Sequence, residues 1–163
     1  MKTELHQLNK IIKRFLTTYL IVLTVGVGVG LIFLMITSDA SSSGLIERWN
    51  GTEEGDEFLV QESYPKPLSE MLITTHNHIF GFAFIFLSIG LIFYFNTTVN
   101  GFWKSFLMIE PFLSTIVTFG SIWLMRFIDS GFIYLVIISA VLMYTCYFIM
   151  LFICLYELNF KKS

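Results

Sequence analysis

The sequence predicts an all-α fold, a four-helix transmembrane bundle that runs up and down through the membrane. Hydrophobic residues make up 55% of the 163 positions, whereas only 13% are charged. A soluble domain of this size needs more charge to cover its surface. The charges are also bunched, which leaves four apolar runs long enough for helices of roughly 20 residues that cross a bilayer. We therefore expect one membrane domain over residues 1–163.

The segments around these runs give the expected connections. Residues 1–14 carry Leu5, Leu8 and Ile12 at helical spacing among polar residues, so we expect an amphipathic helix there, at the inner interface of the membrane. A turn of only a few residues joins the last two runs, which should therefore pack as an antiparallel pair. The expected spans are residues 15–36, 73–95, 102–125 and 132–156.

The placement of Lys and Arg predicts the orientation, because cytoplasmic segments of membrane proteins carry an excess of these cations. If the N-terminus is cytoplasmic, seven of the ten cations lie inside: Lys2, Lys10, Lys13, Arg14, Lys104, Lys161 and Lys162. The other three, Arg48, Lys66 and Arg126, then lie outside. We expect both termini inside (N-in/C-in), in the inner (cytoplasmic) membrane of a bacterium.

The longest connection, residues 37–69, then forms an acidic outer loop. It begins with a flexible run at residues 39–44. Loops of this length without secondary structure are usually functional or disordered, so we expect it to contact a partner outside the membrane. After that run its acidic residues are Glu47, Glu53, Glu54, Asp56, Glu57 and Glu62.

Two histidines at the outer start of the second span, His76 and His78, are the first candidates for chemistry. Histidine is the commonest metal ligand, and polar groups entering a membrane are costly. Positions i and i+2 of a helix point about 200° apart, so the pair cannot easily chelate one ion. Met125 is expected at the same depth and offers a His–Met pair for haem b or a transition metal. The alternatives are a hydrogen-bonded polar helix end and a proton relay.

An ionisable residue inside the third span, Glu110, is the second candidate. Ser114, Thr118 and Ser121 follow it on one face, within an arc of about 80°. This intramembrane polar seam should face the bundle interior, because lipid offers hydroxyls no partners. One interpretation is a proton or ion path, or the wall of a cofactor site. The other is a hydrogen-bonded helix contact, with Glu110 near the inner interface or paired to Lys104.

Small residues indicate where helices could approach closely. Gly26 and Gly30 form a small-xxx-small pair in the first span, and Gly81 and Ser88 give a second small-residue line in the second span. We interpret both as helix-packing positions.

Two stretches carry a resemblance to a protein family. Residues 75–81, with His76 and His78, resemble the start of the second helix in small uncharacterised four-helix bacterial inner-membrane proteins with a His-x-His pair. Residues 106–112, around Glu110, and residues 118–124 are similar to the third helix of the same group. The resemblance spans most of the chain and implies the four-helix fold, but no activity.

Three functional hypotheses follow. The favoured one is a non-enzymatic inner-membrane subunit or scaffold within a larger membrane complex, with a membrane-protein partner or a second copy of the chain. The second is a haem- or metal-binding redox protein that uses His76 or His78, and the third is a proton or ion pathway through Glu110. Enzyme activity is disfavoured, since the sequence has no Gly-rich phosphate loop, nucleophile elbow or HExxH motif. The net charge of −2 argues against nucleic-acid binding.

Overall fold

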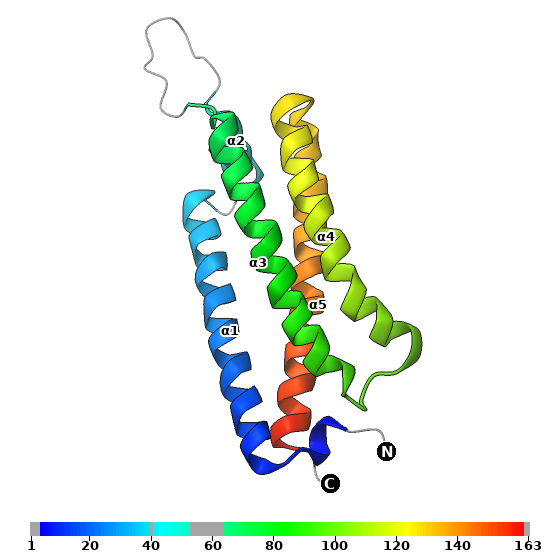
Figure 1. The fold of residues 1–163 in the computed structure, drawn as a ribbon. Coiled ribbons are helices and arrows are strands. Elements are labelled where there is room, and N and C mark those ends of the chain that lie inside the picture. Colours follow the sequence, from blue (N-terminus) through cyan, green and yellow to red (C-terminus); the bar gives the residue numbers. More distant parts are fainter. Residues whose placement is uncertain (1–3, 40, 53–63, 162–163) are drawn as a thin grey trace, which may run out of the picture.

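The computed structural model describes residues 4–39, 41–52 and 64–161. These residues form α-helices and short 3-10 turns, with no strand among them (Figure 1). Four helical segments are long and apolar enough to cross a membrane, which confirms the predicted all-α fold with four spans. In chain order the elements are η1 (Leu5–Gln7), α1 (Lys10–Thr37), α2 (Ser42–Asn50), α3 (Leu68–Tyr94), α4 (Gly101–Phe127), η2 (Ser130–Phe132) and α5 (Ile133–Asn159).

Three of the long helices form the body of the bundle, and α1 stands at its side. The antiparallel pair α4 and α5, joined by η2, makes the most extensive contact, and α3 packs on both. The first span, α1, packs mainly on α5. Both chain termini lie at one end of the bundle, called here the terminal end, and α2 lies at the other, called here the α2 end (Figure 1).

The N-terminal segment differs from the single amphipathic helix expected over residues 1–14. Leu5–Gln7 form one 3-10 turn, and the chain is extended at Asn9. The Asn9 side-chain oxygen accepts the Ile12 N–H at 2.9 Å, so Asn9 caps the start of α1. Leu5 is buried against the bundle, and its N–H donates to the Phe95 carbonyl at 2.9 Å. The helical spacing of the apolar residues favours one continuous helix, but the cap at Asn9 and the contact of Leu5 with the bundle favour a separate 3-10 turn.

The connection between α1 and α3 contains a helix where the sequence analysis expected a flexible run. Ser41 caps α2 by accepting the Gly44 N–H at 3.0 Å. Gly44 lies against the Ser38 carbonyl, where a Cβ atom would collide. Gly51, at a φ of 76°, ends the helix. Of the expected acidic residues of this loop, Glu53, Glu54, Asp56, Glu57 and Glu62 lie outside the described residues.

Two clusters of buried side chains hold the helices together. The larger one joins α1, α3, α4 and α5 along the middle and terminal half of the bundle, and Leu20, Phe86 and Tyr147 are fully buried in it. The smaller one lies at the α2 end, where Trp49 of α2 packs over α3, α4 and α5. Its other buried members are Met71, Phe119, Ile122, Met125, Ile133 and Val136.

A substitution of Leu20 tests whether packing holds α1 to the bundle. Leu20 is 0% exposed, whereas its neighbour Ile21 is 53% exposed. We expect Leu20→Ala to lower the free energy of unfolding by about 2 kcal/mol, the lower end of the range for core leucines. The loss is small because a leucine side chain gains little free energy when it moves from lipid into the protein interior, so mainly packing contacts are lost. Ile21→Ala should change it by less than about 0.5 kcal/mol. Thermal unfolding of both variants in detergent checks this, and equal losses would contradict the packing of α1.

Candidate functional site

The two histidines lie on different faces of α3. His78 turns toward α4, with its ring centroid 5.4 Å from that of Phe119. Its Nδ1 lies 2.8 Å from the Thr74 carbonyl, which can only accept, so Nδ1 carries a proton and Nε2 is the ring nitrogen that this contact leaves open. His76 contacts the ring of Phe80, at 4.8 Å between centroids. The structure therefore does not bring the two imidazoles together.

A cavity of about 890 Å³ lies at the α2 end, between α1 and the other helices. His78 and Met125 both line it, and His76 does not. Within residues 4–39, 41–52 and 64–161, no group of three or more His, Cys, Asp or Glu gathers at one point as a metal cluster. The structure thus places two of the three tentative haem or metal ligands at one cavity and the third away from it, and both histidines are exposed.

The polar seam of α4 is buried, and α5 supplies part of its hydrogen bonding. Glu110 is 6% exposed and accepts a hydrogen bond from the Ser114 hydroxyl, while its second oxygen, Oε2, is buried without a hydrogen-bond partner among the described residues. The Thr118 hydroxyl lies 2.7 Å from the Ser139 hydroxyl of α5. Ser121 is buried as well. Lys104, a candidate partner of Glu110 by sequence, donates to the Asn96 carbonyl at 2.8 Å.

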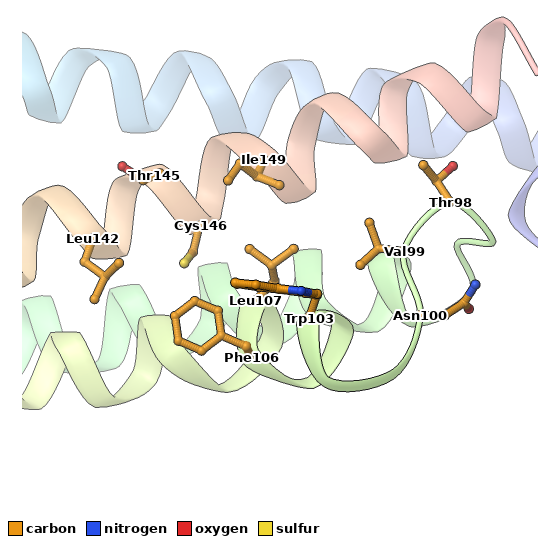
Figure 2. Close-up of a pocket in the computed structure, with 10 residues that line it drawn as sticks. All are labelled: Thr98, Val99, Asn100, Trp103, Phe106, Leu107, Leu142, Thr145, Cys146 and Ile149. Atoms are coloured by element: carbon orange, nitrogen blue, oxygen red, sulfur yellow. The ribbon is translucent and has the colours of Figure 1, made fainter.

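A second, smaller pocket of about 470 Å³ lies between α4, α5 and the connection that precedes α4 (Figure 2). Its lining is mostly apolar, with Trp103 and Phe106 on the α4 side. The Cys146 sulfur points from α5 toward α4 in Figure 2, and this thiol also lies next to Glu110. The pocket therefore sits beside the buried carboxyl of the seam.

A buried carboxylate that the sequence analysis did not single out, Glu157, organises the terminal end. It is 0% exposed, near the end of α5. Its Oε1 accepts hydrogen bonds from the Thr97 N–H at 2.7 Å, the Thr97 hydroxyl at 3.0 Å and the Thr98 hydroxyl at 2.6 Å. Lys161 adds a charged partner at 3.3 Å. We call these four residues the Glu157 network, and it ties the α3–α4 connection to the end of α5.

One signal in the sequence could have revealed this network. Glu157 is an ionisable residue directly after the expected fourth span, and two threonines directly follow Asn96. The expected span stopped at residue 156, which placed Glu157 outside the membrane and hid its burial.

The glycines singled out as packing positions face open space. A Cβ atom built at Gly26, Gly30 or Gly81 meets nothing within 4 Å. Gly26 and Gly30 line the 890 Å³ cavity instead. Ser88 donates to the Ile85 carbonyl of its own helix at 2.9 Å. Within the described residues, none of these glycines is the close contact point of two helices.

A comparison with known protein families also indicates a membrane protein. The family model Aq_1264_TM, described as a transmembrane helical domain, matches residues 39–163, which hold α2 to α5. The chain belongs to this family. It is a small multi-pass membrane protein whose helices contact the lipid bilayer. No curated protein and no solved structure matches the chain. The family match includes the polar seam and the Glu157 network, and it starts after α1.

The two buried carboxyls make a matched pair for mutation. We expect Glu157→Gln to lower the free energy of unfolding by about 2–3 kcal/mol, because several donors, one of them charged, lose a carboxylate acceptor. Glu110→Gln should cost less than about 1 kcal/mol, since Ser114 can still donate to the amide oxygen. Thermal or denaturant unfolding in detergent measures both. A larger loss from Glu110→Gln would show that the seam, not the terminal end, holds the bundle.

Proposed function

We propose that the protein is a non-enzymatic subunit or scaffold of a larger complex in the inner membrane of a bacterium. In this proposal both termini are cytoplasmic and the α2 end faces outward, as the distribution of Lys and Arg favours. The acidic loop after α2 then meets a partner outside, and one face of α3 meets a partner helix within the membrane. The observation that carries the proposal is the exposure of two polar side chains on α3.

His76 and Asn77 are exposed at a depth where lipid surrounds the helix. At 1.5 Å per residue, the 27 residues of α3 are about 40 Å long, and the hydrocarbon core is about 30 Å thick. For a centred helix, His76 then lies roughly 7 Å inside the core. No hydrogen bond from the described residues reaches either side chain. Polar groups at this depth need partners, and acyl chains have none to give.

The surface next to His76 and Asn77 fits a transmembrane helix. Gly81 lies just below them with open space around it, so another backbone can approach closely. Phe80 and Phe84 flank this glycine and are more than half exposed. These five residues are called the α3 face. A neighbouring helix with Ser, Thr, Asn or Gln at the matching position would supply the missing hydrogen bonds.

Site-specific crosslinking in cells tests the α3 face. A photo-reactive phenylalanine analogue at Phe84, which is 67% exposed, should give one discrete protein adduct. The same analogue at Leu113 of α4, which is 59% exposed, should give only lipid products. Gly81→Leu should reduce the Phe84 adduct at least tenfold, because the leucine side chain occupies the contact.

The matched control is Gly120→Leu on α4, since Gly120 is equally open. It should leave the adduct unchanged. An adduct with a second copy of this chain would make the complex a homo-oligomer. Lipid products alone at both positions would contradict the proposal.

A redox role is the second candidate, because His78 and Met125 line one cavity. The lone pair on His78 Nε2 and the Met125 thioether are the ligand types of a His–Met haem or a copper site. Elemental analysis and the absorption spectrum of the detergent-purified protein test this. If the role is real, iron or copper is present at about one per chain and is lost in His78→Ala. His76→Ala is the control, because His76 does not line the cavity. Metal that survives His78→Ala would remove this candidate.

A further inference from the structure

The cavity at the α2 end opens sideways to the bilayer. Phe33 of α1 and Val141 and Phe152 of α5 all line it, and each is more than half exposed. A residue that both lines a cavity and reaches the surface marks an opening, so a mouth lies between α1 and α5, and the exposed His78 marks a second opening beside α3. On the α1 side the lining begins at Gly26, just above Thr24, whose hydroxyl lies 3.2 Å from the Tyr147 hydroxyl and joins α1 to α5. The cavity is therefore a trench that α2 covers at one end and that opens sideways to lipid.

The α1 wall of this trench has about the depth of one leaflet. It runs from Gly26 to Ser38, about 18 Å at 1.5 Å per residue, and one leaflet contributes about 15 Å of hydrocarbon. The α5 wall is longer and runs from Ile133 to Phe152, about 28 Å. The volume of about 890 Å³ lies in the range of sites that hold small molecules. An apolar trench of this length and opening accepts an acyl chain that lies parallel to the helices.

The charged group of the trench, Arg48, lies at its α2 end, with Ser38, Ser41 and Ser42. Thr74 and His78 of α3 lie deeper, roughly 4 Å and 10 Å inside the core if α3 is centred in the bilayer. Deeper along the walls, the hydroxyls of Thr118 and Thr145 bond to protein oxygens, and Tyr144 also lines the cavity. The positive charge of the lining is thus at the depth of the lipid headgroups, and most of the wall below it is apolar.

Arg48 gives this end a positive charge. One of its nitrogens donates to the Thr37 hydroxyl, and the guanidinium lies 4.9 Å from the centroid of the Phe33 ring at the mouth. Partial burial lowers the pKa of Arg48 and the nearby Glu70 raises it, and arginine stays charged at neutral pH in either case. Glu70 is itself paired with Lys66, so these three residues sum to one positive charge. The guanidinium has further N–H groups, which match a phosphate.

We propose that this trench is a binding site for one anionic glycerophospholipid of the leaflet on the α2 side. One acyl chain lies between α1 and α5 along the glycine side of α1, and the phosphate lies against Arg48 under α2. The glycines have a role in this arrangement, because larger side chains at Gly26 and Gly30 would fill the space of the chain. This site is separate from the α3 face, so the lipid proposal does not depend on whether a partner helix binds there.

Native mass spectrometry of the full chain in detergent tests the site, with dioleoyl phosphatidylglycerol and dioleoyl phosphatidylcholine as probes. We expect one phosphatidylglycerol to bind at least tenfold more tightly than phosphatidylcholine. Arg48→Ala should reduce that affinity roughly tenfold and remove most of the preference, because a charge-assisted contact to phosphate is lost. Arg48→Lys should retain most of the preference for the anionic lipid.

Gly30→Leu should abolish the tightly bound lipid, and Gly28→Leu is the matched control. An added Cβ atom meets nothing within 4 Å at either glycine, but only Gly30 lines the cavity. Both substitutions also raise helix propensity equally, so a folding defect specific to Gly30→Leu is not expected. Equal binding of the two lipids that neither substitution changes would mean ordinary surface lipid and would overturn the site. A haem, or a helix of another protein, found in the trench would overturn it as well.

Discussion

The carboxylate of Glu157, buried at the terminal end, is the interaction on which the arrangement of the helices depends. It gathers the backbone and hydroxyl donors of the α3–α4 connection and the ammonium of Lys161, so that α3, α4 and α5 meet at one point. Two further contacts bring the N-terminal segment to the same end: Leu5 of η1 bonds to Phe95, and Thr17 of α1 bonds to Asn159. A carboxylate buried in this way is held by its donors, and the donors have no other acceptor of equal strength.

The α2 end follows a different principle. From the Thr24–Tyr147 contact onward, α1 diverges from α5, and the short helix α2 covers the gap with Trp49 and Arg48 (Figure 1). The bundle is thus closed at one end and open to lipid at the other. Lipid gives helices no hydrophobic reason to close such a gap, so an acyl chain can take the place of a side-chain contact. The glycines that face open space on α1 and α3 make no close contact within the described residues, which is why both proposals place a ligand or a partner there.

The sequence predicted the parts of the structure that depend on composition and periodicity. Four apolar runs became four long helices, because a spanning segment must satisfy its own backbone. The parts that depend on single contacts were not predicted from the sequence. Asn9 interrupts the N-terminal helix, Ser41 and Gly51 delimit α2, and Glu157 is buried in the bundle. The divergence of His76 and His78 followed from the helical angle, but which of the two contacts α4 depends on how α3 packs on that helix. Helical spacing predicts which residues share a face of a helix. Which of these faces a neighbouring helix covers depends on the packing.

The measurement that tests this account most directly is the separation of α1 from α5 at both ends, by pulsed electron paramagnetic resonance in lipid nanodiscs. Spin labels at Thr18 and Phe160 report the terminal end, and labels at Ile36 and Tyr134 report the α2 end; all four residues are exposed, and both native cysteines are buried. The account predicts a narrow, short distance at the terminal end and a longer one at the α2 end, beyond the roughly 8–10 Å between the axes of packed helices. Equal separations at the two ends would show that α1 lies flat on α5, with no room for a lipid, and would contradict it.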